Sequence, residues 1–179
     1  MGYETILLIF VIICFILIWF SITYNKFQTY IIRINEAEAN IDSVLRKRYD
    51  LLSKISKVIE ENTKDNDVLK QIKDMKSSNL SNFEVDRIVM DGINEFSIYK
   101  EKYPKLKDNE LFIKTDIELI NSESEIISLK KYYNDIITEY NRYGRIFPSI
   151  IVALVLRYKQ RTYFDGKDMN DDNIKDFKL

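Results

Sequence analysis

Residues 6–22, ILLIFVIICFILIWFSI, form an apolar run in which Ser21 is the only polar side chain. As a helix, this run extends about 26 Å, close to the thickness of the hydrocarbon core of a bilayer. Trp19 lies where interfacial aromatic residues are found. Glu4 but no basic residue precedes the run, which argues against a cleaved signal peptide. The sequence therefore predicts a retained transmembrane anchor over residues 1–23 that contacts the lipid bilayer through residues 6–22.

The charges around this anchor predict its orientation. Lys26 and Arg33 follow the apolar run, whereas no lysine or arginine precedes it. Basic residues favour the cytoplasmic side of a membrane span. We therefore expect a single-pass protein of the cell membrane, with its N-terminus outside and the bulk of the chain in the cytoplasm.

From Phe27 to Ile59 the apolar residues recur at intervals of seven, which indicates one wide apolar face on a long helix. The columns are Phe27, Ile34, Ile41, Arg48 and Ile55; Ile31, Glu38, Leu45, Leu52 and Ile59; and Ala37, Val44, Leu51 and Val58. Neither glycine nor proline lies between Ile22 and Phe27, so we expect the anchor to continue directly into this helix.

Three further helices are expected after the polar segment ENTKDN. A short amphipathic one contains Val68, Leu69, Ile72 and Met75. Ser81 and Glu84 have the spacing of a capping box, which begins the next helix, and Pro104 ends it. Asp108 or Asn109 can cap the last one.

The last of these helices has the most regular pattern in the chain. One column holds Phe112, Leu119, Ile126, Tyr133, Tyr140 and Phe147, and the column beside it holds Ile113, Ile120, Ile127, Asn134 and Asn141. Two long helices with apolar stripes and two shorter helices between them predict an all-α, antiparallel four-helix bundle over residues 24–164. Only four glycines and two prolines occur, which also favours long helices. The polar tail, residues 165–179, is expected to be disordered.

A second apolar run, residues 146–156, lies between basic side chains. About 16 Å of helix is too short to cross a bilayer. The run is apolar on all sides, which favours a short closing helix that caps the bundle core, and insertion into the membrane is the alternative. The flanking basic residues are candidate membrane-surface residues in either case: Arg142, Arg145, Arg157, Lys159 and Arg161.

The composition excludes most catalytic chemistry. The chain has no histidine, and its one cysteine, Cys14, lies within the apolar run, so imidazole, thiol and structural-zinc chemistry are excluded. The 27 basic and 28 acidic residues nearly cancel, so nucleic acid is not an expected partner. Catalysis by carboxylates alone would need a pair such as Glu123 and Glu125. Two residues apart on a helix, these side chains point in different directions, so we expect them to be solvated surface charges. We expect a protein that is not an enzyme and binds no cofactor or metal.

Four polar residues fall in apolar columns and are candidate interaction or polar-network residues: Glu38, Arg48, Asn134 and Asn141. In the structural interpretation, the arginine extends its charged end to water and the asparagines fix the register of the helices. In the functional interpretation, they form a polar network or an exposed groove that a partner completes.

Several motifs, in order, resemble those of LemA-family membrane proteins. They are YNKFQTYIIRINEAEANIDSVLRKRYDLLSKI (Tyr24–Ile55), YPKLKDNELF (Tyr103–Phe112), KKYYNDIITEYN (Lys130–Asn141), FPSIIVAL (Phe147–Leu154) and Tyr163-Phe164. The resemblance extends over residues 5–164. Glu38 stands where the family commonly has Trp, Ser53 where it has Pro and Ser124 where it has Asn.

This resemblance implies a single-pass membrane protein with a cytoplasmic helical bundle, a link to envelope or membrane-compartment organisation, and no catalytic residue. Our first functional hypothesis is a non-catalytic scaffold or adaptor that binds another protein at the cytoplasmic face. The sequence leaves open whether the chain also forms homo-oligomers. The alternative is a lipid-binding or membrane-shaping module that uses residues 146–156. A third, open possibility is that the N-terminal peptide is released as a signal.

Overall fold

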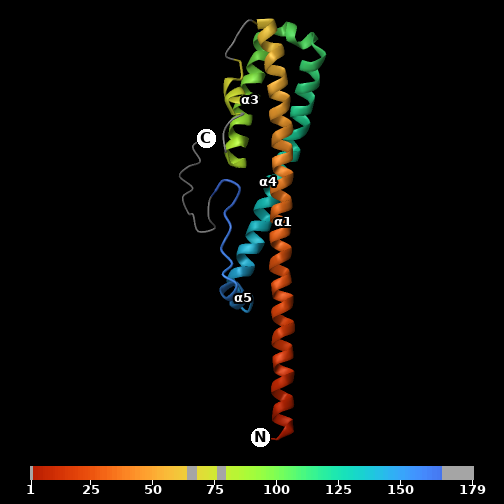
Figure 1. The fold of residues 1–179 in the computed structure, drawn as a ribbon. Helices are drawn as coiled ribbons and strands as arrows, with labels where there is room; N and C mark the ends of the chain where they lie inside the picture. Colours follow the sequence, from red (N-terminus) through yellow and green to blue (C-terminus); the bar gives the residue numbers. More distant parts are fainter. Residues whose placement is uncertain (1, 64–67, 76–79, 167–179) are drawn as a thin grey trace. The chain divides into compact units, whose positions relative to one another are not determined.

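The computed structural model describes residues 2–63, 68–75 and 80–166, and these residues form helices and connecting segments without any strand. The elements in chain order are α1 (Tyr3–Thr63), α2 (Lys70–Asp74), α3 (Asn82–Lys102), the 3-10 helix η2 (Pro104–Asp108), α4 (Glu110–Arg145) and α5 (Ser149–Val155) (Figure 1). The predicted all-α fold is confirmed. Most of the polar tail lies outside the described residues, so its predicted disorder stays a prediction.

α1 is a single helix of 61 residues. It runs through Ile22 and Phe27 without interruption, as expected from the lack of a breaker between them. The apolar side chains of residues 6–18 are exposed apart from Cys14, and no other described part of the protein covers the most apolar part of α1. Among the described helices, α1 alone is long and apolar enough to cross a membrane.

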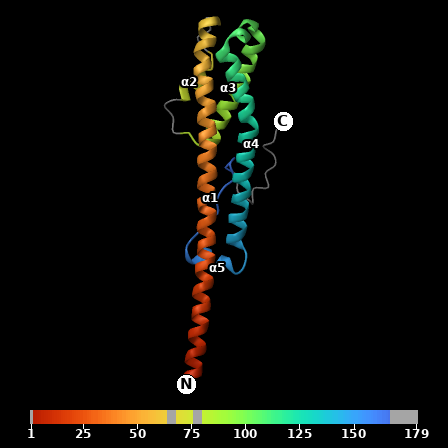
Figure 2. The same ribbon diagram turned by 90° about the vertical axis from the view of Figure 1, so that its right-hand side faces the viewer.

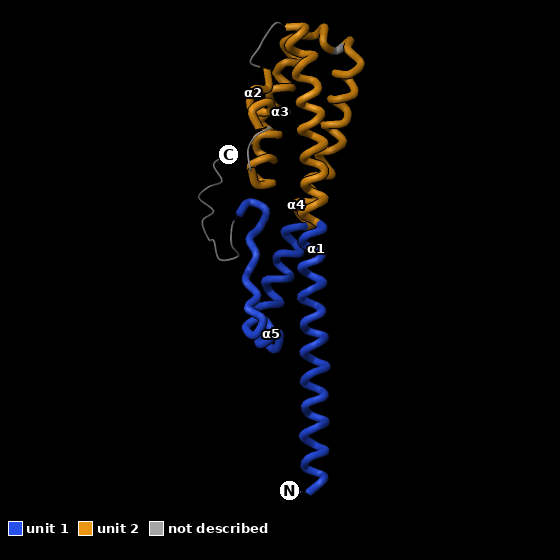
Figure 3. Tube along the Cα trace, in the orientation of Figure 1, with its two compact units in different colours: residues 1–36, 133–179 blue, residues 37–132 orange. Residues whose placement is uncertain are grey.

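The chain divides into two compact units, which Figure 3 shows in different colours. Unit 1 comprises residues 1–36 and 133–179, and unit 2 comprises residues 37–132. Each unit contains part of α1 and part of α4, and in each the two helices run antiparallel. Each unit is described by itself below.

The core of unit 2 is built from the apolar columns of three long helices together with α2. Its buried side chains are Leu52, Ile55, Ile59, Val68, Leu69, Ile72, Val89, Phe96, Leu106, Phe112 and Leu119. The rings of Phe96 on α3 and Phe112 on α4 lie 4.7 Å apart. Gly92 lets α2 approach α3 closely, because a Cβ atom there would lie only 2.9 Å from the side chain of Ile72.

Two helix starts in unit 2 have the caps that the sequence predicts. The Ser81 hydroxyl accepts a hydrogen bond from the backbone N–H of Glu84, and the Glu84 carboxylate accepts one from the backbone N–H of Ser81. The hydrogen bonds that the Glu84 carboxylate accepts from the backbone N–H and from the hydroxyl of Ser81 hold the pKa of Glu84 below its ordinary value of 4.5. At α4, Asn109 rather than Asp108 is the cap, since its Oδ1 accepts from the backbone N–H of Phe112 at 3.1 Å.

The core of unit 1 is centred on Phe27, which is fully buried. Its ring lies 6.0 Å from that of Tyr140, 4.9 Å from that of Tyr143 and 4.7 Å from that of Tyr158. Figures 1 and 2 both show α5 beside α1, with the chain after α5 returning along α4. Val152 and Ala153 of α5 are buried, so α5 closes this end of the core, as predicted.

The expected apolar faces are only partly correct. Glu38, assigned to the core face, is exposed, and so are Ile113, Ile120 and Ile127. A straight α-helix turns by about 20° per seven residues relative to a strict heptad repeat, so the members of one column do not all face the core. Leu45 and Asn141, which lie later in these same columns, are buried. Apolar positions along one column are therefore not all buried.

Candidate interaction surfaces

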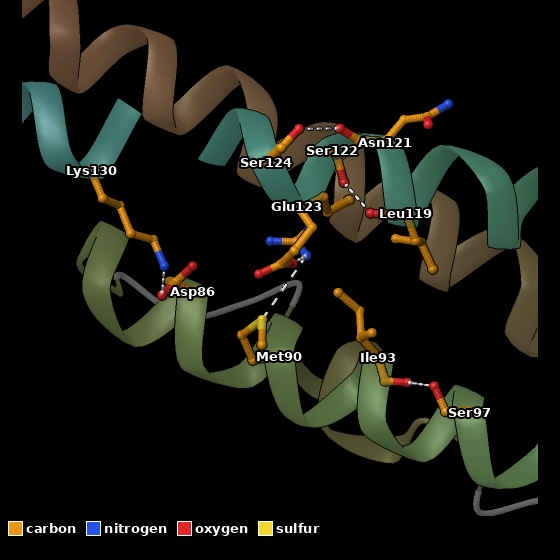
Figure 4. Close-up of polar contacts among 11 residues, drawn as sticks. Asp86, Met90, Ile93, Ser97, Leu119, Asn121, Ser122, Glu123, Ser124 and Lys130 are labelled. Carbon is orange, nitrogen blue, oxygen red and sulfur yellow. Dashed lines mark hydrogen bonds and ion pairs between the residues drawn. The ribbon is translucent and has the colours of Figure 1, made fainter. Parts of the chain in front are cut away.

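Arg48 is enclosed in unit 2, with 1% of its side chain exposed. Its Nη2 donates to Glu123 of α4 in an ion pair and lies 4.0 Å from the sulfur of Met90 on α3. Figure 4 shows Glu123 and Met90 on these two helices. The expectation that the arginine extends to water is therefore wrong. Because α3 and α4 cover it, the guanidinium ends among side chains and belongs to a buried polar network.

The network leaves part of the guanidinium without hydrogen bonds. Within the described residues, Nε and Nη1 of Arg48 have no hydrogen-bond partner. The side chain of Glu123 is 42% exposed, so its carboxylate is accessible to water, whereas the side chain of Arg48 is shielded from it. The expectation of a solvated Glu123 is thus half correct, since its carboxylate also neutralises a buried charge. Such a site is sensitive to loss of the acid, because a buried cation then has no counter-charge.

A second ion pair links α3 and α4 near this network. Lys130 Nζ donates to Asp86 Oδ2 at 2.5 Å, and Asp86 is buried (Figure 4). Asp86 precedes the buried Val89 by three residues, so both lie on one face of α3. Sequence reasoning missed Asp86 as a polar-network residue, although its place beside the apolar column was a usable signal.

The asparagines of α4 bind the chain's own C-terminal segment in unit 1. Asn141 is buried, its Nδ2 donates to the backbone carbonyl of Arg161 at 2.7 Å, and its Oδ1 accepts from the N–H of the same residue at 2.9 Å. Asn134 Oδ1 accepts from the backbone N–H of Phe164 at 2.9 Å. The polar end of this column is thus covered by residues 159–164.

Two hydroxyl groups add to the binding of this segment. The Tyr140 hydroxyl donates to the backbone carbonyl of Lys159 at 3.0 Å, and Thr138 and Tyr163 share a hydrogen bond at 3.1 Å. Burial raises the pKa of Tyr140, although the nearby positive charge of Arg161 acts in the opposite direction. Residues 159–164 are therefore attached to α4 mainly through their own backbone.

The five candidate membrane-surface residues are all exposed in unit 1: Arg142, Arg145, Arg157, Lys159 and Arg161. The apolar run between them is only partly buried. Phe147 and Leu154 are 79% and 72% exposed, and Val155 is exposed as well. Because α5 is short and covers the core with one face only, its other face stays uncovered.

These observations define an all-α bundle protein with one N-terminal candidate membrane helix, an arrangement that fits a single-pass membrane protein. A sequence model of the LemA family matches residues 37–175, which is more than half of the chain. The protein therefore belongs to the LemA family, as the ordered motifs predicted. No curated protein matches the chain in a sequence comparison.

Proposed function

We propose that this LemA-family protein is a non-catalytic scaffold, anchored in the cell membrane by α1, that binds an apolar helix of a partner protein on α4 of unit 2. One observation carries the proposal. Four isoleucines of α4, 45–63% exposed, form a stripe along the helix, here called the isoleucine stripe: Ile113, Ile117, Ile120 and Ile127.

The spacing of the stripe supports a helical partner. Its members follow one another at intervals of four, three and seven residues, which is the spacing of the contact positions in a coiled coil. Ser124 occupies the one intermediate position. Amphipathic helices bind such surfaces through side chains spaced by three, four and seven residues. Exposed apolar side chains gathered on one face are also typical of interaction sites.

The sequence supports the remaining parts of the proposal. The absence of histidine and the position of Cys14 within the apolar run leave few groups for acid–base or nucleophilic chemistry. Lys26 and Arg33 follow the membrane segment, which favours a cytoplasmic location for the helical body.

A matched pair of substitutions tests the scaffold role. Ile120 belongs to the isoleucine stripe and is 63% exposed, whereas Ile98 lies on α3 of the same unit and is 62% exposed. The full chain, fused at its C-terminus to a proximity-labelling enzyme, is expressed in the native cell as wild type, Ile120→Lys or Ile98→Lys. We expect the labelling of specific proteins to be lost with Ile120→Lys and retained with Ile98→Lys. Equal labelling by all three proteins, or the same losses with both substitutions, would overturn the proposal.

A further inference from the structure

We propose that α5 and the turn before it form a second membrane contact, which inserts into the headgroup region and binds anionic phospholipids. Its parts are the exposed side chains of Phe147, Leu154 and Val155, here called the α5 face, and the five basic residues around them. This lipid site goes beyond the scaffold role, because it involves unit 1 and needs no protein partner.

The segments on either side of α5 pack against α1 just beyond the apolar run. Thr23 is buried, so the body of unit 1 begins to cover α1 directly after the apolar run. Phe27 lies against Tyr143 and Tyr158, and Gln28 donates to the Tyr158 hydroxyl at 2.8 Å. The residues on either side of α5 are therefore fixed to α1 about one turn beyond Ile22.

This position coincides with the headgroup layer if residues 6–22 cross the hydrocarbon core. Phe27 follows Ile22 by five residues, about 7.5 Å of helix. The headgroup region on one side of a bilayer is about 5–7 Å thick. Within unit 1, Figures 1 and 2 show α5 at the end of the helical body nearest the N-terminal part of α1. The α5 face is therefore held where a bilayer surface begins.

The α5 face is apolar and exposed. Ser149, Val152 and Ala153 are buried, whereas Phe147 and Leu154 are among the most exposed large apolar side chains of unit 1. α5 is thus apolar on both faces, and the face directed away from the core is uncovered. Interfacial helices bury such a face at the boundary between headgroups and acyl chains.

The chain around the α5 face is basic. From residue 142 to 164 the chain carries five basic residues and no acidic one, whereas the whole chain has a net charge of −1. All five side chains are exposed. A cavity of about 240 Å³ in unit 1 is lined by Arg145 and Lys159 together with apolar residues such as Leu154. Basic side chains beside an apolar face complement a phospholipid, whose anionic phosphate lies next to its acyl chains.

Tryptophan fluorescence of the full chain in vesicles tests the α5 face. Trp19, the only native tryptophan, is replaced by phenylalanine, and Phe147→Trp places the probe on the face. Vesicles contain phosphatidylcholine alone or with phosphatidylglycerol, plus lipids with a bromine or nitroxide quencher near the headgroup. We expect lipid quenching at Phe147→Trp that is about twofold stronger with phosphatidylglycerol. Ile98→Trp in the same background should be quenched by aqueous acrylamide and not by lipid.

A charge variant separates lipid recognition from mere proximity to the membrane. Arg157→Gln, Lys159→Gln and Arg161→Gln together keep the backbone groups that bind α4, and helicity is checked by circular dichroism. We expect lipid quenching at Phe147→Trp to fall to the phosphatidylcholine level. The proposal is overturned if the probe is quenched by acrylamide alone, or if lipid quenching is equal in both vesicle types and unaffected by the charge variant.

Discussion

Removal of the Glu123 carboxylate should destabilise unit 2 more than removal of the Arg48 guanidinium. In the Glu123→Ala variant a buried cation keeps its charge and loses its ion-pair partner. Loss of one partner of a fully buried pair costs about 3–5 kcal/mol. Because Glu123 is 42% exposed, its removal lets some water reach Nη2, so we expect a loss of about 2–3 kcal/mol.

The Arg48→Met variant should behave differently. Methionine fills a similar apolar volume and removes a guanidinium with two nitrogens that lack hydrogen bonds in the described part of the chain. The Glu123 carboxylate left behind is accessible to water. Replacement of buried ion pairs by apolar residues is often neutral or stabilising, so we expect a change within about 1 kcal/mol.

Thermal unfolding of the full chain in detergent, followed by circular dichroism at 222 nm, measures both effects. For a chain of this size, 1 kcal/mol shifts the midpoint by about 2–4 °C, so Glu123→Ala should lower it by about 4–12 °C. The control Glu125→Ala removes an exposed carboxylate nearby and should change little. The double variant should resemble Arg48→Met. Equal destabilisation by the two single substitutions, with additive effects in the double variant, would refute this reasoning.

Three further predictions concern other parts of the protein. Asn141→Ala removes both hydrogen bonds to the C-terminal segment, so hydrogen exchange of residues 159–164 should become faster; unchanged protection would contradict this role. Gly92→Ala places a Cβ against the buried Ile72 of α2 and should destabilise the protein by about 1 kcal/mol in the same melting assay. In Gly144→Ala the new Cβ would lie 3.8 Å from the ring of Phe27, an ordinary van der Waals distance, so this variant should be neutral or stabilising. Burial raises the pKa of Tyr140, so its contribution to stability is complete below about pH 10 and is lost as pH rises through the raised value; Tyr140→Phe should remove this part of the alkaline loss in a pH series of melts.

The helices were predictable because their signals are local. Seven-residue spacing marked α1 and α4, and the capping box of Ser81 and Glu84 and the cap at Asn109 marked two helix starts. Each of these signals lies within a few residues of the feature it specifies. The all-α fold therefore followed from the sequence, and so did the resemblance to the LemA family.

The environments of individual side chains were less predictable because they depend on distant segments. Arg48 is enclosed through Glu123, which follows it by 75 residues. Asn141 is buried because residues 159–164 cover it, whereas Ile120, in the same heptad column, has no such cover among the described residues and is exposed. Spacing along one helix reveals which residues share a face, but not what covers that face at each level.

Zero-length carbodiimide crosslinking of the full chain, read by mass spectrometry, tests most directly the central claim that the apolar columns pair α1 and α4 antiparallel. In unit 2, Lys47 Nζ lies 3.4 Å from Glu118 Oε2, and Lys130 Nζ lies 2.5 Å from Asp86 Oδ2. We expect a crosslink between Lys47 and Glu118, which joins α1 to α4, and a crosslink between Lys130 and Asp86, which joins α4 to α3 and serves as the positive control. Crosslinks from Lys47 to Asp135 in place of Glu118, or none between α1 and α4, would contradict this pairing.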